Sequence, residues 1–480
     1  MALTAPQGSS APATAAAVTH ATPARVILIS AVAALGGFLF GYDTAVINGA
    51  VDAVRGNFAL DAAQIGIAVS CALLGSAIGA WYAGWIADRF GRVRTMQVAA
   101  VLLAVSALGA GLAHSVWALI PWRLIAGIGV GVASVIAPAY IAEVSPAHVR
   151  GRLGSLQQLA IVLGIFVALA ADAVLAGAAG SAAAPFWLGL AAWRWMFIVA
   201  TVPAVVYGTL VLAVPESPRY LVARGESGLA GDVLRQVLGV SDNDELRIKV
   251  REIEASLRAE HRPRLRDLRG PRGLLPVVWI GIALSVFQQF VGINVIFYYS
   301  STLWHSVGFS EADSFKITVA TSITNVLVTL VAIALVDRIG RKPLLAIGSA
   351  GMTLTLAVMA SCFAHAGGSG TAVSLPSPYG AIALAAANLY VVFFGVSWGP
   401  VVWVLLGEMF PNRIRALGLA VAAAAQWLAN FLITATFPYL AEISLTFAYG
   451  LYALFAALSL IFVITAARET KGVELEAMTS

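Results

Sequence analysis

Asp43 is the residue whose type and position suggest the most specific chemistry. It lies inside the apolar run 25–50, where an ionised carboxylate is costly unless it is paired or hydrated. Arg123, in the outer third of another apolar run, is its natural partner. Burial favours the protonated acid, whereas a nearby guanidinium favours the ionised acid. A pair that separates in one conformation would bind and release a proton; a permanent pair would only hold two helices together.

Carboxamides form a second group of candidate residues, because membrane spans rarely contain them. A carboxamide donates and accepts hydrogen bonds at once, which matches the hydroxyl groups of a sugar. If the seventh run is one helix, Gln288 or Gln289 shares a broad face with Asn294. The plainer alternative is that these amides bond one helix to another. The candidate amides inside apolar runs are Gln157, Gln158, Gln288, Gln289, Asn294, Asn325 and Gln426.

Three charged motifs occur twice in the same order, once in each half of the chain. This repetition indicates a duplicated unit, and parallel repeats of this kind typically place a transporter's substrate site near the middle of the membrane. Opposite charges at helix ends of the two halves can pair when that side of the protein is closed. Exposed pairs are worth only ~0–1 kcal/mol each, which suits a gate that reopens. A plainer interpretation is that they only mark tight loops and orientation. These gate charges are Asp88, Arg89, Arg92, Glu143, Arg150 and Glu216 in the first half, and Asp337, Arg338, Arg341, Glu408, Arg415 and Glu469 in the second.

The elements that position these residues are twelve apolar runs, each long enough as a helix to cross ~30 Å of hydrocarbon. With 60% apolar and 11% charged residues, the composition excludes an ordinary soluble protein. We predict an all-α membrane protein of twelve transmembrane helices in two six-helix pseudo-repeats, with a cytoplasmic helical linker. The predicted boundaries are a flexible tail at 1–24, a bundle at 25–214, the linker at 215–274, a second bundle at 275–467 and a tail at 468–480.

The distribution of basic residues sets the expected orientation. Arginine and lysine gather between the runs on one side, which predicts a multi-pass protein of the plasma membrane with both termini cytoplasmic. The same distribution argues against a nucleic-acid partner, despite the net charge of +5. Cys71 and Cys362 lie inside apolar runs and indicate neither a disulfide framework nor a metal site. The sequence has no phosphate loop or nucleophile–base pair in its spans, so we expect a transporter and not an enzyme, with no cofactor. We also expect the transporter to be a monomer.

Together these motifs resemble the sugar porter family of the major facilitator superfamily, from about Gly36 to Gly472. The likeness is greatest to bacterial proton–xylose and proton–glucose symporters. It rests on Gly41-Tyr42-Asp43, the run from Glu143 to Gly151, Pro-Glu-Ser-Pro-Arg at 215–219, and Gln288-Gln289-Phe-Val-Gly-Ile-Asn294.

The resemblance assigns further roles to residues of this chain. Family symporters carry Asp at the position of Asp43, where passive facilitators carry Asn. Some relatives have a second carboxylate where this chain has Ala200, which leaves Asp43 as the sole candidate proton carrier. Gly399-Pro400 is expected to break the tenth helix. The implied sugar contacts are the amides Gln158, Gln288, Gln289, Asn294 and Gln426, and the aromatic residues Phe40, Tyr298, Trp403 and Trp427.

The resulting functional prediction is proton-coupled import of a monosaccharide by alternating access, driven by the proton gradient. Ile165 stands where xylose symporters of the family carry glutamine, which favours D-glucose over xylose, with xylose and galactose kept as alternative substrates. Three alternatives stay open: a passive facilitator, a polyol carrier on the same fold, and a non-transporting sugar sensor. Asp43 argues against uniport, and the short sequence after the last apolar run argues against a sensor.

Overall fold

The structure is a computed structural model that describes residues 24–146, 150–238, 243–259, 265–270, 273–367, 374–411, 414–467 and 469–470. The predicted tails at 1–24 and 468–480 lie almost wholly outside these ranges. Within them, 12 helical segments are long and apolar enough to cross a membrane, as predicted.

The first six spans are built from eight helices, because the first and sixth spans are each divided by a kink. The helices are α1 (Ala24–Ala45), α2 (Ile47–Phe58), α3 (Ala62–Phe90), α4 (Arg92–Gly111), α5 (Val116–Val144), α6 (Arg150–Ala179), α7 (Ala192–Val199) and α8 (Thr201–Val211), with the 3₁₀ turn η1 (Trp187–Gly189) before α7. The last six spans are α12 (Pro276–Phe290) with α13 (Ile293–Ser306), α14 (Glu311–Ile339), α15 (Arg341–Phe363), α16 (Tyr379–Val396) with α17 (Trp398–Met409), α18 (Arg415–Ile443) and α19 (Leu445–Thr465).

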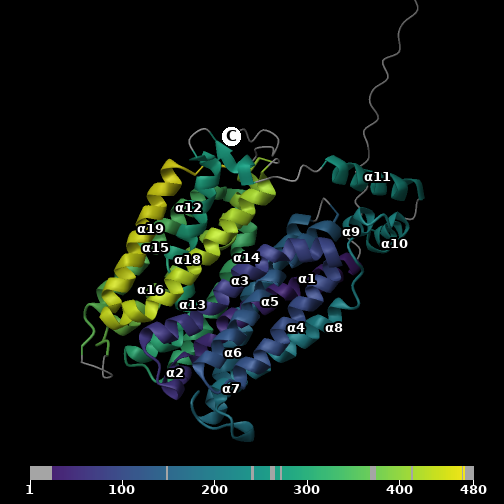
Figure 1. The fold of residues 1–480 in the computed structure, drawn as a ribbon. Coiled ribbons are helices and arrows are strands. Elements are labelled where there is room, and N and C mark those ends of the chain that lie inside the picture. The colour runs from purple at the N-terminus through teal and green to yellow at the C-terminus, as the bar shows by residue number, and fades with distance from the viewer. Residues whose placement is uncertain are drawn as a thin grey trace, which may run out of the picture.

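The segment between the two bundles folds into three short helices. They are α9 (Pro218–Ala223), α10 (Ser227–Leu238) and α11 (Asn243–Ala259), followed by η2 (Leu265–Leu268) and the antiparallel strands β1 (Arg269–Gly270) and β2 (Gly273–Leu274). The Ser217 hydroxyl accepts a hydrogen bond from the Tyr220 amide, and Pro218 occupies the first turn, so α9 has a capped start. We call the end of the molecule that carries α9–α11 the linker face, and the opposite end the α2 face (Figure 1).

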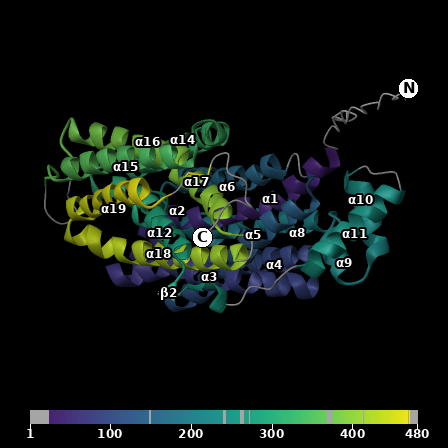
Figure 2. The same ribbon diagram turned by 90° about the horizontal axis from the view of Figure 1, so that it is seen from above.

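The two six-helix bundles lie side by side, and α9–α11 lie at the outer edge of the first (Figure 2). Contacts between the bundles run mainly from α3 to α18 and from α6 to α14, with α2 against α13. The buried apolar residues of the two bundles form one continuous cluster, so the halves share a core where they meet.

Breaks in the spans lie near the predicted site residues. The seventh span was expected to be one helix, but α12 ends at Phe290 and α13 begins at Ile293. Gly292 has φ of 88°, which a residue with a side chain rarely adopts. The tenth span was expected to break at Gly399-Pro400; it breaks at Ser397, and Pro400 lies in the first turn of α17, where its missing N–H leaves no bond unmade.

Candidate functional site

The predicted pair of Asp43 and Arg123 is formed. One guanidinium nitrogen of Arg123, Nη1, donates to Asp43 Oδ1 at 3.1 Å and to the Asp43 carbonyl at 3.3 Å. The Arg123 side chain is 2% exposed and that of Asp43 is 13% exposed, and the guanidinium lies 5.7 Å from the centre of the Phe197 ring. α1 supplies the acid and α5 the base, so a shift between these helices would separate the charges.

The pair uses only part of its hydrogen-bonding capacity. Asp43 Oδ2 and Arg123 Nε are buried and have no hydrogen-bond partner among the described residues. A carboxylate held by one nitrogen, with its second oxygen unpartnered, is poorly stabilised for so buried a charge. The site can therefore exchange its guanidinium partner for a proton without dismantling a larger network.

The amides of the seventh span form a chain of hydrogen bonds across the helix break. Asn294 Nδ2 donates to Gln289 Oε1, and Gln289 Nε2 donates to Gln288 Oε1 at 3.3 Å. Gln288 Nε2 then donates to the carbonyls of Trp398 at 2.8 Å and Gly399 at 3.3 Å. Gln289 and Asn294 meet because the chain turns between α12 and α13, not because they share one helical face.

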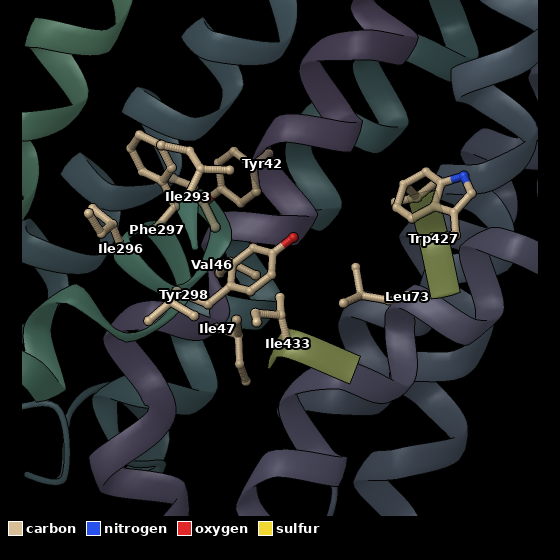
Figure 3. Packing of buried hydrophobic residues seen from close by; sticks show 14 of the residues in the cluster. Tyr42, Val46, Ile47, Leu73, Ile293, Ile296, Phe297, Tyr298, Trp427 and Ile433 are labelled. Carbon is tan, nitrogen blue, oxygen red and sulfur yellow. The ribbon is translucent and has the colours of Figure 1, made fainter. Parts of the chain in front are cut away.

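Tyr298 connects this region to the acid–base pair. Its hydroxyl interacts with Asn430 on α18, and it is close enough to Asp43 and Arg123 to interact with them electrostatically. Figure 3 shows Tyr298 in the same apolar cluster as Val46 at the α1–α2 kink. Asn430 was not among the predicted site residues, although an amide one helical turn after Gln426 was a usable signal.

The remaining predicted sugar contacts lie at several places around the junction of the bundles. Phe40 on α1 and Trp427 on α18 form an aromatic pair with ring centres 5.6 Å apart, so they bridge the two halves. Gln426 is partly buried, and its Oε1 has no partner among the described residues. Gln158 is partly buried on α6, and Trp403 on α17 is 42% exposed. An amide oxygen without a partner is available to a ligand's hydroxyl group.

The charged motif of the first half forms a compact cluster at the linker face. Arg92 forms two hydrogen bonds to the Glu143 carboxylate, from Nε to Oε2 at 3.0 Å and from Nη2 to Oε1 at 2.9 Å. Its Nη1 lies 3.4 Å from Asp88 Oδ1. Glu216 accepts from the backbone amides of Arg92 and Val93, so this carboxylate caps the start of α4.

The second half repeats this cluster. Arg341 donates from Nε to Glu408 Oε2 at 3.1 Å and from Nη2 to Glu408 Oε1 at 2.8 Å, and the Thr470 hydroxyl also donates to Glu408 Oε2. Glu469 accepts from the backbone amides of Arg341 and Lys342, as Glu216 does at α4. The sequence predicted ion pairs between the two halves. The Arg92–Glu143 and Arg341–Glu408 pairs each lie within one half, so in this conformation they do not connect the two bundles at the linker face.

The other gate charges have different surroundings. Arg89 lies 5.7 Å from the Trp85 ring centre, and Arg415 Nε donates to the Phe410 carbonyl at 3.2 Å. Arg338 is exposed at the end of α14. The side chains of Arg150 and Asp337 lie outside the described part of the chain.

Polar bonds between the halves are found at the α2 face instead. Asn48 Nδ2 donates to the Phe297 carbonyl at 2.9 Å, and Ser301 Oγ donates to the Asn48 carbonyl at 2.8 Å. Arg55 on α2 also pairs with Glu442 on α18. Hydrogen bonds and an ion pair therefore close the two bundles on one another at the α2 face.

The sequence analysis left Asp43 as the sole candidate proton carrier, but the structure buries a second acid within the spans. Asp172 on α6 is 0% exposed and accepts a hydrogen bond from the Gly49 amide at 3.3 Å. The signal was visible in the sequence, because Asp172 is a single acid within a long apolar run. Among the described residues, no group of three or more His, Cys, Asp or Glu side chains could hold a metal ion.

Comparison with known proteins gives matches along nearly the whole chain. The profile of the family described as "Sugar (and other) transporter" matches residues 29–480. A glucose transport protein of Synechocystis sp. is 57% identical over 94% of this chain and 97% of its own length. The D-xylose-proton symporter of Escherichia coli is 38% identical over 95% of this chain and 96% of its own length.

Solved structures match the fold as well. The inward open conformation of the xylose transporter XylE from E. coli has a TM-score of 0.80 and 36% sequence identity, and the match covers 94% of this chain and 99% of that chain. Its partially occluded inward open conformation gives a TM-score of 0.79 at 35% identity, over 92% of this chain and 100% of that chain.

Proposed function

This chain belongs to the sugar transporter family, and we propose on that premise that it imports a monosaccharide together with protons. The observation that carries the proposal is the buried ion pair of Asp43 and Arg123, which lies within electrostatic range of Tyr298 in the second half. A passive facilitator has no need of a titrating pair at this depth. The relatives named as proton symporters support the same reading.

Asp43 carries the proton in this proposal. When α1 and α5 move apart, the carboxylate loses the Arg123 guanidinium and takes up a proton, because an unpaired buried charge is costly. When the pair forms again, as it stands in this structure, the proton leaves. One proton moving down 100 mV supplies ~2.3 kcal/mol, which corresponds to about fiftyfold accumulation of the sugar.

The sugar site uses the amides of the second half. Gln289 and Asn294 present the polar edge of the broken seventh span, while Phe40 and Trp427 offer apolar faces that suit the C–H face of a sugar ring. Ile165 is partly buried beside α1, where Gly41 contacts the α6 backbone. We propose D-glucose as the substrate, because Ile165 adds no polar constraint and the relative at 57% identity is named a glucose transport protein.

The proposed orientation places the linker face in the cytoplasm and the chain in the cell membrane, with both termini inside. Basic residues of the repeated motifs lie at the linker face, in agreement with the positive-inside rule. The α2 face is then external, and its bonds between Asn48 and α13 hold it closed. This is an inward-facing state, as in the inward open and partially occluded inward open structures of the xylose transporter XylE.

The test is uptake of radiolabelled glucose and xylose by transporter-null cells, with wild type compared to Asp43→Asn, with and without a protonophore. We expect wild-type accumulation to collapse with the protonophore, and the variant to exchange sugar without accumulating it. Preference for glucose over xylose is read from the same cells. Uptake that never exceeds equilibrium and ignores both perturbations would show a facilitator, with Asp43 and Arg123 as a structural pair.

A further inference from the structure

Asp172 is a buried acid to which the proposed transport mechanism gives no role. It lies on α6 about two turns before the end of the helix at Ala179, so ~10 Å from the α2-face end. Its Oδ2 accepts the Gly49 amide at 3.3 Å, and its Oδ1 is buried with no partner among the described residues. Only one of the two carboxyl oxygens of Asp172 therefore has a hydrogen-bond partner in this conformation.

The fit between Asp172 and α2 is close. A Cβ atom on Gly49 would lie 2.7 Å from both Cβ and Oδ2 of Asp172, so only glycine lets α2 approach the acid this closely. The next residue back, Asn48, bonds α13 in the other half through Phe297 and Ser301. The first turn of α2 is therefore held by Asp172 on one side and by the opposite bundle on the other.

No positive charge faces Asp172 from the described parts of the packed helices. The Tyr42 hydroxyl on α1 interacts with it electrostatically, and it too is buried without a hydrogen-bond partner. Charged groups on the elements packed against α6 bind partners other than Asp172: Arg25 with Gln236, Asp43 with Arg123, Asp52 with His305, Arg55 with Glu442, Glu143 with Arg92, Arg194 with the carbonyls of Gly111 and Ala113, Glu311 with the Ala182 amide, and Asp313 with Lys316.

We propose that Asp172 is a second proton-binding residue, which holds a proton while α2 closes the external face. Burying an unpaired carboxylate in hydrocarbon is costly, whereas the neutral acid fits the same space and still accepts the Gly49 amide. When α2 separates from α6, water reaches the carboxyl group and the proton dissociates. Closing α2 then requires a proton from outside.

Proton binding at Asp172 is separate from proton binding at Asp43. The inference rests on the proposed function for the assignment of the α2 face to the outside of the cell. Protonation of one group coupled to closure changes the open–closed equilibrium by at most about tenfold per pH unit. Rising external pH therefore keeps the α2 face open and slows the turnover of the empty and loaded carrier alike.

The direct test is infrared spectroscopy of the carboxyl C=O stretch in the purified protein at neutral pH. We expect a band of a protonated, buried acid that Asp172→Asn removes and that Asp43→Asn and Asp313→Asn retain. Asp313 is a matched control because its side chain is 54% exposed and pairs with Lys316. Persistence of the band in Asp172→Asn, or its absence from wild type, would overturn the proposal.

The functional test is sugar counterflow in proteoliposomes at equal pH on both sides, which needs no proton gradient. It compares Asp43→Asn with the double variant Asp43→Asn/Asp172→Asn, so that Asp43 cannot contribute to the pH profile. Exchange should fall with rising pH in the single variant and stay flat in the double variant; superimposable profiles would refute the inference. Gly49→Ala, which pushes the acid away from α2, should weaken the pH dependence as well. Because counterflow reads alternating access alone, it separates this result from a failure of proton-driven accumulation.

Discussion

Removing Arg123 should uncouple transport without abolishing exchange. In Arg123→Met the carboxylate of Asp43 loses the guanidinium nitrogen that now contacts its Oδ1 at 3.1 Å and its carbonyl at 3.3 Å. Among the described residues, Asp43 forms an ion pair with no cation besides Arg123. We therefore expect Asp43 to stay protonated throughout the cycle.

The magnitude follows from the burial of the pair. Leaving one member of a buried ion pair without its partner costs ~3–5 kcal/mol. Protonation removes this cost, so Asp43 without its guanidinium partner holds a proton more tightly. A proton held that tightly would not be released to the cytoplasm in each cycle, so the pH gradient would no longer drive accumulation.

The assay is glucose transport by proteoliposomes, measured as accumulation under an imposed proton gradient and as counterflow without one. We expect Arg123→Met to lose accumulation and keep counterflow, as we expect for Asp43→Asn. The double variant should be no worse than either single variant, because the two residues act as one unit. Thermal stability of all three proteins controls for misfolding. Retained gradient-driven accumulation in Arg123→Met, or additive losses in the double variant, would refute the reasoning.

Five other substitutions test the site and the gate. Gln288→Ala should lower the thermal midpoint of unfolding, because it removes the side-chain donor to two buried carbonyls, at a cost of ~1–3 kcal/mol. Gln426→Ala should weaken glucose binding with little loss of stability, because the Gln426 Oε1 has no partner among the described residues. Calorimetry measures the first effect and a glucose-binding assay the second. Arg92→Ala and Arg341→Ala should slow uptake to a similar extent, because the clusters repeat, and a large difference in uptake rate between them would contradict equivalence of the halves. Ile165→Gln should raise xylose uptake relative to glucose uptake by about fivefold, because the new amide adds one hydrogen bond worth ~1 kcal/mol. An unchanged ratio of xylose to glucose uptake in a competition assay would show that residue 165 does not set selectivity.

The fold could be predicted from the sequence because a membrane imposes length and polarity on each span separately. Twelve apolar runs gave twelve spans, and the repeated motifs placed Arg92 and Arg341 in equivalent clusters. The Asp43–Arg123 pair was predictable for the same reason: both charges are isolated within apolar sequence, and each is costly without the other.

What escaped prediction depends on conformation or on contacts between distant segments. The partners of the gate charges differ between open and closed states, so sequence alone gave no state-specific pairing. The turn at Gly292 joins Gln289 to Asn294 in a way that helical spacing does not indicate. Asp172 was visible as a lone acid, but its contact with Gly49 requires the close packing of α2 on α6.

The position of the two helix breaks suggests how proton and sugar binding can be coupled. Asp43 lies just before the α1–α2 kink in the first half, and Gln289 lies just before the α12–α13 break in the second. The segments after the breaks, α2 and α13, are bonded to each other through Asn48. Movement of Asp43 away from Arg123 therefore shifts α1 at a point continuous with α2, while a sugar that binds Asn294 acts on α13. Because α2 and α13 share hydrogen bonds, a shift at one break changes the energy of the other, and neither bound species needs to touch the other for the halves to move together.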